Sequence, residues 1–120
     1  MEETLFNVQG QPKAYIAYDD ESTIYLWGGL PVAYLENNDI YGFNGKHLGW
    51  YEDGVVRDHA GSIVGFNGKA ATVSVAIEPF KAFKAFKPFK AFTQFAPFKP
   101  FYNTSTSELE LVEFLMQGRD

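Results

Sequence analysis

The stretch Ile40-Tyr41-Gly42-Phe43-Asn44-Gly45-Lys46-His47-Leu48-Gly49-Trp50 decides the fold of this chain. It has the composition of a β-hairpin, with Ile40, Tyr41 and Phe43 in the arm before Asn44-Gly45 and Leu48 and Trp50 in the arm after it. Asn-Gly is a strong hairpin turn, because glycine adopts a positive φ at no steric cost. A single two-stranded hairpin is only marginally stable in water. This hairpin must therefore share a hydrophobic core with other elements of the chain.

The same hairpin pattern occurs four times in the first half of the chain. Four glycines, separated by 19, 16 and 16 residues, set the copies in register: Gly10, Gly29, Gly45 and Gly61. A small residue stands four positions after each glycine: Ala14, Ala33, Gly49 and Gly65. An aromatic residue stands one position later: Tyr15, Tyr34, Trp50 and Phe66. We expect the small residues to let backbones approach and the aromatic residues to fill a shared centre, with an axial pocket lined by these rings as the alternative.

Two further signals extend the predicted sheet beyond the fourth repeat. Asn67-Gly68 is a second Asn-Gly pair and predicts a hairpin turn. The segment from Thr72 to Ile77 alternates polar and apolar residues, which is typical of a half-buried strand. We therefore expect this segment to close the sheet before Pro79.

The repeat resembles the bacterial family called 4-fold β-flower proteins. The resemblance rests on residues 29–35, 40–54 and 57–66. It implies an all-β fold of four hairpins arranged as petals about a pseudo-fourfold axis, followed by a Pro-rich triplet-repeat tail. It brings no established activity and no site residues. The chain departs from the family in the Phe-Lys character of its tail triplets and in the longer connector before Ile24. Other arrays of hairpins with aromatic residues and glycine at turn spacing remain the alternative.

Phenylalanine recurs at every third position in the tail: Phe80, Phe83, Phe86, Phe89, Phe92, Phe95, Phe98 and Phe101. An α-helix is excluded because Pro88, Pro97 and Pro100 would break it, and a strand would place alternate rings on opposite faces. Polyproline II has three residues per turn and no internal hydrogen bonds, so it accepts every proline and places all the rings in one row. We therefore predict a polyproline II tail.

A second row of the tail carries positive charge. It contains Lys81, Lys84, Lys87, Lys90 and Lys99. Residues 1–78 have a net charge of −7, residues 79–101 of +5 and residues 102–120 of −3. Alternating aromatic and cationic residues can bind single-stranded nucleic acid, but the acidic body repels polyanions. We therefore expect the lysines to attract an acidic body of this chain or of a sister chain, with nucleic acid or another anionic surface as the alternative.

The eight rings need a partner surface. Drawn out as polyproline II, residues 80–101 would span roughly 70 Å, whereas a compact chain of this length has a diameter of about 35 Å. A row of exposed phenylalanines also exceeds the apolar patch that soluble monomers tolerate. The tail must therefore wrap around its own domain, pair with other tails, lie across neighbouring copies, or meet a foreign protein.

A short amphipathic helix is predicted at the C-terminus. Ser107 with Glu110, or Ser105 with Glu108, offers a capping box, and Gly118 suits the end of the helix. Its apolar stripe contains Leu111, Val112, Phe114 and Leu115. A helix of about ten residues is marginal alone, so it needs a surface on which to dock.

The sequence offers little evidence for a catalytic or metal-binding site. The chain has no cysteine, and no P-loop, dinucleotide-binding or nucleophile-elbow pattern occurs. Asp58 and His59, with His47 from a neighbouring repeat, are the candidates for acid-base or metal work, but the repeat register favours structural roles for both histidines. We predict no enzyme activity, no cofactor, no metal and no membrane span, and a cytoplasmic location.

The sequence thus predicts three segments: a β-flower domain over 1–78, a polyproline II segment over 79–102, and a linker with a short helix over 103–120. The binding residues we expect are the eight tail phenylalanines together with Lys81, Lys84, Lys87 and Lys90. The leading hypothesis is a non-enzymatic structural or interaction module that forms homo-oligomers, or binds another protein, through this tail.

Overall fold

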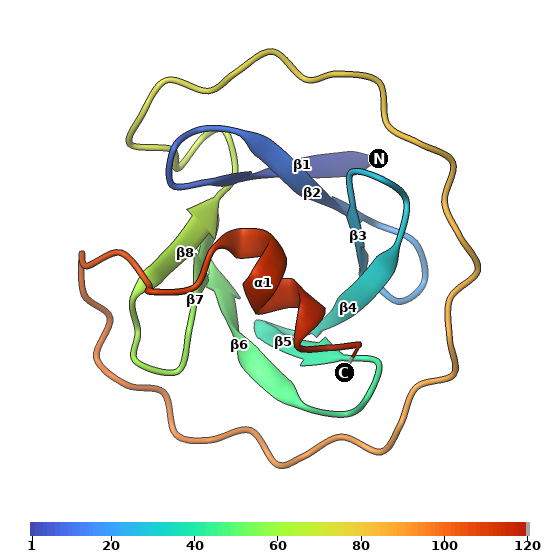
Figure 1. Ribbon diagram of the computed structural model, residues 1–120. Helices are drawn as coiled ribbons and strands as arrows, with labels where there is room; N and C mark the ends of the chain where they lie inside the picture. Colours follow the sequence, from blue (N-terminus) through green and yellow to red (C-terminus); the bar gives the residue numbers. More distant parts are fainter. Residues whose placement is uncertain (120) are drawn as a thin grey trace.

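Eight antiparallel strands close into a barrel in chain order in the computed structural model, which describes residues 1–119. The strands are β1 (Glu2–Asn7), β2 (Pro12–Ala17), β3 (Thr23–Leu26), β4 (Pro31–Glu36), β5 (Asp39–Gly42), β6 (His47–Glu52), β7 (Val55–Arg57) and β8 (Ile63–Phe66). They form four hairpins around one axis, and β8 pairs with β1 to close the ring (Figure 1). The predicted four-hairpin flower is confirmed.

The four hairpins share their local geometry. The repeat glycines all have positive φ: Gly10 at 83°, Gly29 at 94°, Gly45 at 86° and Gly61 at 82°. The pairing register of each hairpin also shifts at the same place in the repeat. The shift falls between the residues five and four positions before the glycine, as at Ile24/Tyr25 and Ile40/Tyr41. Such bulges increase the twist of a strand pair. The sequence repeat is therefore a repeat of backbone conformation.

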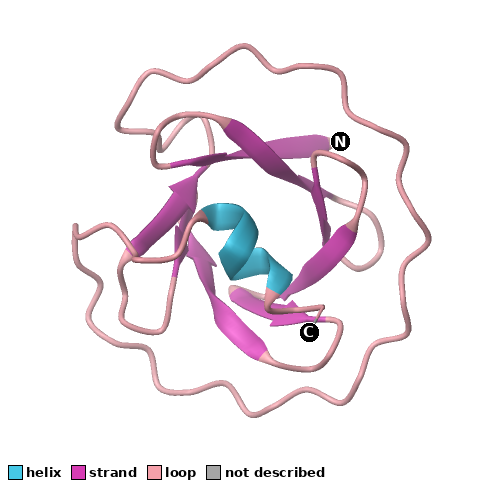
Figure 2. Ribbon diagram, viewed as in Figure 1, coloured by secondary structure: helices cyan, strands magenta, loops and turns pink. Residues whose placement is uncertain are grey.

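The centre of the barrel is aliphatic and is closed by the C-terminal helix α1 (Leu111–Met116), which lies in the middle of the ring (Figure 2). Leu111, Phe114 and Leu115 of α1 are buried. They join a core made of Leu5, Ala14, Ile16, Ile24, Val32, Ala33, Ile40, Leu48, Val56 and Val64. A Cβ added at Gly49 would lie 3.0 Å from the Phe114 ring. The small repeat residues therefore make room for the helix.

The repeat aromatic residues lie outside the barrel wall, so the prediction that Tyr15, Tyr34, Trp50 and Phe66 fill the centre or line an axial pocket is wrong. Successive strand residues point to opposite faces, and the small residue before each ring takes the inner face. Tyr15 stacks on Tyr25 at 5.5 Å, and Tyr34 stacks on Tyr41 at 6.2 Å. These rings fill the junctions between petals on the outer surface.

After β8 the chain leaves the barrel, circles its outside and returns to the axis as α1 (Figure 1). Residues 72–77 form no strand, so the predicted closing strand is wrong. Asn67-Gly68 does not connect two strands either, because the barrel is already closed by β8 and β1. The molecule is a flat disc of 37 × 36 × 22 Å. The predicted domain boundaries at residues 78 and 102 stay predictions.

The predicted helix begins later than expected. Glu110 is its N-cap and forms a capping box with Glu113, so neither predicted box, Ser107 with Glu110 or Ser105 with Glu108, is correct. The Ser107 hydroxyl instead accepts a hydrogen bond from the Leu109 N–H. Gly118 follows the C-cap Gln117, as expected, and a side chain there would collide with the Val32 carbonyl.

Candidate interaction surface

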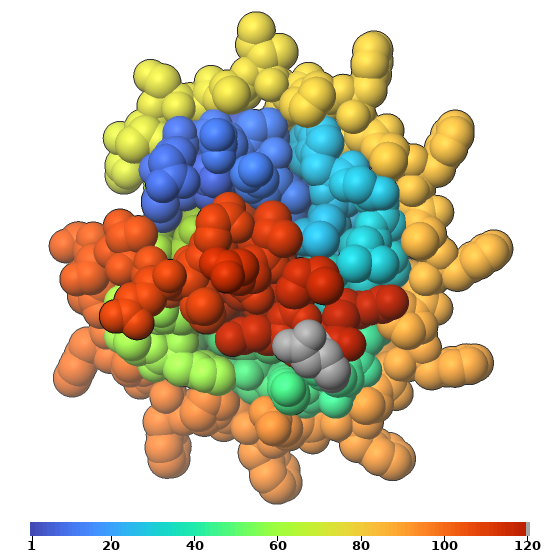
Figure 3. Space-filling view, viewed as in Figure 1, coloured from blue at the N-terminus to red at the C-terminus, as the bar shows by residue number. Residues whose placement is uncertain are grey.

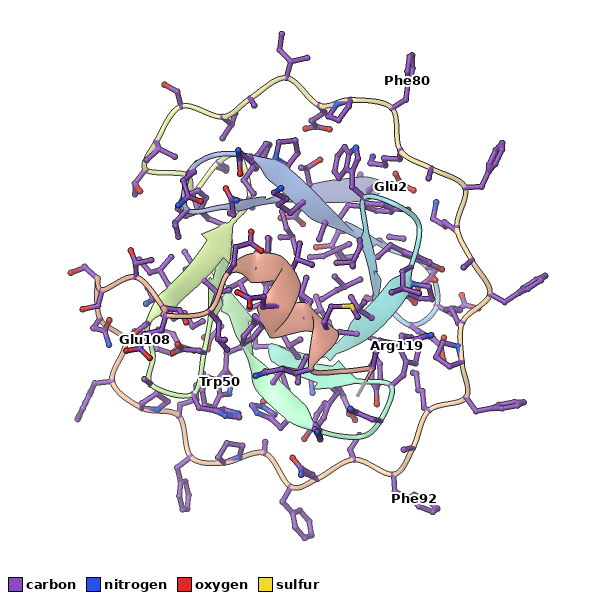
Figure 4. All side chains as sticks on the ribbon, viewed as in Figure 1. Glu2, Trp50, Phe80, Phe92, Glu108 and Arg119 are labelled. Atoms are coloured by element: carbon purple, nitrogen blue, oxygen red, sulfur yellow. The ribbon has the colours of Figure 1, made fainter. Side chains whose placement is uncertain are left out.

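Residues 79–102, here called the belt, present their phenylalanines to solvent. All eight rings, here called the Phe row, are between 98% and 103% exposed. Phe80 and Phe92 point radially away from the barrel (Figure 4). In the space-filling view the outer side chains of the belt stand out as separate knobs around the rim (Figure 3). The tail therefore wraps its own barrel, yet leaves its aromatic row uncovered.

The lysines of the belt face the barrel and form ion pairs with it. Lys81 and Lys84 bind the two carboxylate oxygens of Glu2 at 2.9 and 2.7 Å. Lys87 and Lys90 share Glu21 at 2.7 and 2.9 Å. Lys99, which the sequence analysis did not include among the binding residues, pairs with Glu52 at 2.6 Å. All five lysines are thus matched to carboxylates of the same chain.

The same lysines lie over the aromatic junctions between petals. The Lys81 ammonium is 4.8 Å from the centre of the Tyr15 ring and 5.1 Å from that of Trp27. Lys90 is 4.0 Å above the Tyr34 ring. These are cation–π distances, and each such contact at a half-exposed site contributes about 0.5–1 kcal/mol. The outward-facing aromatic residues of the repeat therefore form the contact points, here called seats, on which the belt lies.

The belt, together with the residues just before and just after it, bonds the barrel with a backbone period of nine residues. The carbonyls of Gly10, Gly29, Gly45 and Gly61 accept hydrogen bonds, and their donors are the N–H groups of Ala76, Ala85, Gln94 and Asn103. Each donor is nine residues after the one before it. Three triplets therefore pass over each petal, and the belt repeats in step with the barrel.

This nine-residue period was missed from the sequence, although prolines signal it. Pro79, Pro88 and Pro97 are themselves nine residues apart. In neighbouring triplets the residue at the same position, such as Ala85 or Ala91, donates its backbone N–H to a carbonyl of the barrel. Proline has no N–H to donate, so it fits where the belt crosses from one petal to the next.

The repeat glycines have a second role beneath the belt. A Cβ at Gly29 would collide with the Phe83 carbonyl, and a Cβ at Gly45 would collide with the Phe92 carbonyl. The same holds for Gly10 with the Ser74 carbonyl. Glycine is therefore required both for the turn and for the close passage of the belt.

Gln94 replaces lysine at a third contact point, here called the third seat, where it meets Tyr41 and His47 of the barrel. The Tyr41 hydroxyl donates to the Gln94 carbonyl at 2.9 Å, and the His47 N–H donates to the Gln94 side chain at 3.0 Å. At the end of the belt the Arg57 guanidinium lies 4.4 Å from the centre of the Tyr102 ring and donates to the Asn103 carbonyl at 2.7 Å. The belt is thus fixed at every petal it crosses.

The ion pairs lower the pKa values of the carboxylates that face the belt lysines. Hydrogen bonds from Lys84 and Lys81 hold the pKa of Glu2 below its ordinary value of 4.5. Lys87 and Lys90 lower the pKa of Glu21, and Lys99 and Tyr102 lower that of Glu52. These carboxylates therefore stay charged, and keep the belt bound, at neutral pH.

The histidine candidates form a chain of side chains beside the third seat. His47 is buried and its Nε2 lies 2.9 Å from the Asp39 carboxylate. Its Nδ1 lies 3.0 Å from Nε2 of His59, and the two rings stack. Burial, and then the electrostatic interaction with His47, lower the pKa of His59. Asp58 caps its own turn by accepting from the N–H groups of Ala60 and Ser62.

This cluster fits a packing role. Within residues 1–119 no group of three or more histidine, cysteine or acidic side chains could hold a metal ion. Trp50 packs edge-on against both imidazoles. In the repeat, His59 takes the position of Trp27 and Phe43, which fill the other petal junctions. The hydrogen bonds and stacking account for the geometry of these residues.

Comparison with known proteins identifies one family. The family model described as "4-fold beta flower protein" matches residues 3–115. No curated protein and no solved structure matches the chain. The family description names a fold and no activity. No helix in the described part of the chain is long and apolar enough to cross a membrane.

Proposed function

The chain belongs to the 4-fold beta flower protein family, and from this premise we propose that it is a non-enzymatic structural module that self-associates through the Phe row of its belt. The observation that carries the proposal is the complete exposure of eight consecutive triplet phenylalanines on an ordered segment. Burying one large aromatic side chain contributes about 1.5–3 kcal/mol relative to exposure. Burial of all eight rings against a partner would therefore contribute a large free energy that an isolated copy does not obtain.

The folding of this chain does not need the Phe row. The belt is already held by ion pairs, cation–π contacts and backbone hydrogen bonds on its inner side. The rings contribute no burial to the barrel, because they are fully exposed. An apolar surface of this size on a single protein marks an interaction site. A second copy of the chain carries a matching surface.

We also infer that the belt backbone is polyproline II. Nine residues per petal correspond to 36 residues for a complete turn around four petals, or roughly 110 Å at the polyproline II rise of ~3.1 Å per residue. A circle 37 Å across, the width of the disc, has a perimeter of roughly 115 Å, which a polyproline II chain of this length fits. The absence of helix or strand in residues 79–102 agrees with this conformation.

The alternative, binding of nucleic acid or another anionic surface through the lysines, has less support. All five belt lysines face acidic groups of the same chain. A phosphate backbone would have to displace those carboxylates while approaching a molecule of net charge −5. The two functions differ in salt response, since added salt weakens polyanion binding and screens repulsion between copies of like charge.

The experiment compares the molar mass of the full chain with that of two variants, by light scattering. In one variant all eight phenylalanines of the Phe row become serine, and in the matched control all eight become leucine. Truncation of the tail is unsuitable, because it would also remove α1 from the barrel core. We expect oligomers for the wild type and the leucine variant, and a monomer for the serine variant.

Circular dichroism of the serine variant checks that the barrel is intact. A wild type that stays monomeric at millimolar concentration would contradict the proposal. So would a serine variant that is folded and keeps the mass of the wild-type oligomer, since association would then use another surface.

A further inference from the structure

The spacing of the Phe row suits a second Phe row. Successive rings are three residues apart, which is roughly 9 Å at the belt backbone and about 12 Å at the ring tips because the belt curves outward. One ring inserted midway would lie about 4.7–6 Å from each neighbour, within the range of ~4.5–7 Å that aromatic pairs prefer. The gaps between the knobs of the rim are visible in Figure 3.

The curvature of the rim limits the size of each contact. Two discs 37 Å wide are both convex, so only two or three rings of each copy can engage at one point of contact. Such a contact buries roughly 600–1,500 Å² in total, which is around the lower limit of about 1,200 Å² for a stable protein interface. A single contact is therefore weak, and stable association needs several.

The length of the Phe row provides several contacts. At nine residues for each of four petals, a full circle around the barrel would take twelve triplets. The Phe row covers seven of these twelve steps. If each neighbouring copy engages two or three rings, the eight rings of one disc can contact about three neighbours. Among residues 1–119, the exposed large hydrophobic residues outside the Phe row are Met1, Tyr18, Val73, Val75 and Ile77, so stacking of the discs has no second row of rings to use.

We propose that the Phe rows of neighbouring copies interdigitate edge to edge and build an open layer one molecule thick. This inference deepens the proposed function and rests on it. The contact does not require identical arcs, because any arc of one row can meet any arc of another, and contacts between different arcs need not close into a ring of fixed size. The assembly therefore grows with protein concentration.

The test uses two full-length variants with the same composition. The contiguous variant keeps Phe86, Phe89 and Phe92 and changes the other five phenylalanines of the Phe row to serine. The dispersed variant keeps Phe80, Phe89 and Phe98 and changes the other five. Both retain three rings, but only the contiguous variant has adjacent rings that form slots for a partner.

Sedimentation velocity and atomic force microscopy give the readouts. We expect the wild type to form assemblies that grow with concentration and lie flat with a height near the 22 Å thickness of the disc. The contiguous variant has one arc, so it should dimerise weakly, with a mass that rises with concentration toward twice that of a single chain and no further, and it should shorten wild-type assemblies when mixed with them. The dispersed variant should stay monomeric.

Three results would overturn the inference while leaving self-association intact. They are a wild-type oligomer of fixed mass, assemblies much thicker than one disc, and equal association by the contiguous and dispersed variants. A wild type that is monomeric in solution but floats with phosphatidylcholine vesicles would overturn both proposals, since the Phe row would then be a lipid-binding edge.

Discussion

Two sets of aromatic residues occupy the same rim of this molecule and behave in opposite ways. The junction aromatics between petals, such as Tyr15, Tyr34 and Trp50, are buried beneath the belt. The phenylalanines of the belt, which point outward, are completely exposed. The junction residues are mostly tyrosine, tryptophan and histidine. Lysine lies over the ring face of Tyr15, and the polar atoms of Trp27 and Tyr41 donate to backbone carbonyls. The outer residues are all phenylalanine, which has no polar atom to satisfy.

This difference separates the residues that fold the chain from the residues that are available to a partner. Changes beneath the belt should destabilise the fold, whereas changes on the Phe row should leave stability almost untouched. Three contrasts set a residue that the barrel contacts against a matched residue that it does not contact, and a fourth sets the belt against the barrel as the pH falls.

The largest contrast is between two phenylalanines. Phe114→Ala removes a fully buried ring from the centre of the barrel and should lower the free energy of unfolding by about 3–5 kcal/mol. Phe92→Ala removes a fully exposed ring and should change it by less than about 0.5 kcal/mol. Urea denaturation followed by circular dichroism measures both. A cost above 2 kcal/mol for Phe92→Ala would mean that the ring packs on its own barrel.

Two adjacent glycines provide the next contrast. Gly29 has a φ of 94° and lies under the Phe83 carbonyl, so Gly29→Ala should cost about 1–3 kcal/mol through backbone strain alone and more through displacement of the belt. A Cβ at Gly28 meets no atom within 4 Å, and Gly28→Ala should be close to neutral. The measurement is thermal or urea unfolding of the two variants. Equal costs for both would contradict the assigned path of the belt.

A smaller effect is expected at the third seat. Gln94→Ala leaves the N–H of the buried His47 without its side-chain acceptor and should cost about 1–2 kcal/mol. Thr93→Ala, at the exposed neighbouring position, should cost less than about 0.5 kcal/mol. Hydrogen exchange at the His47 amide gives a local readout of the same contrast. Unchanged protection in Gln94→Ala would show that this hydrogen bond does not hold the belt.

The smallest effect is the pH dependence of the belt. The pKa values of Glu2, Glu21 and Glu52 are lowered by their lysine partners. A lowered pKa in the folded state stabilises the protein above the ordinary value of 4.5 and loses that contribution as the pH falls through the folded value. Each exposed ion pair contributes at most about 1 kcal/mol, so the belt should loosen below about pH 4.5 while the barrel stays folded.

The indole N–H of Trp27, which donates to the Pro79 carbonyl at 3.2 Å, reports this loosening by NMR. Its resonance should shift on acidification before the resonances of the barrel core do. A Trp27 signal that moves only together with global unfolding would show that the ion pairs do not control the belt.

The fold could be predicted from the sequence because the hairpin repeat is a local pattern. Glycines with positive φ, β-branched arms and acidic connectors each act over a few residues, and they agreed on four petals. The direction of the rings could not be deduced in the same way. Whether Ala33 or Tyr34 faces inward depends on what fills the centre, and that is α1, which lies far along the chain.

The path of the belt was only partly predictable. The period of three was evident from the phenylalanines, and all eight rings are exposed on the belt. The strand expected over residues 72–77 failed because the closed barrel has no free edge to pair with it. The seating of the belt depends on a second period of nine, set by Pro79, Pro88 and Pro97, which becomes meaningful once the size of a petal is known.

The most direct test of the central claim, that the Phe row is an association surface, is the molar mass of the full chain measured by light scattering across protein concentration, at low and at high salt. The account predicts a mass that rises with concentration, and that rises further with salt because copies of net charge −5 repel one another less. A mass equal to that of one chain at every concentration and salt level would contradict it.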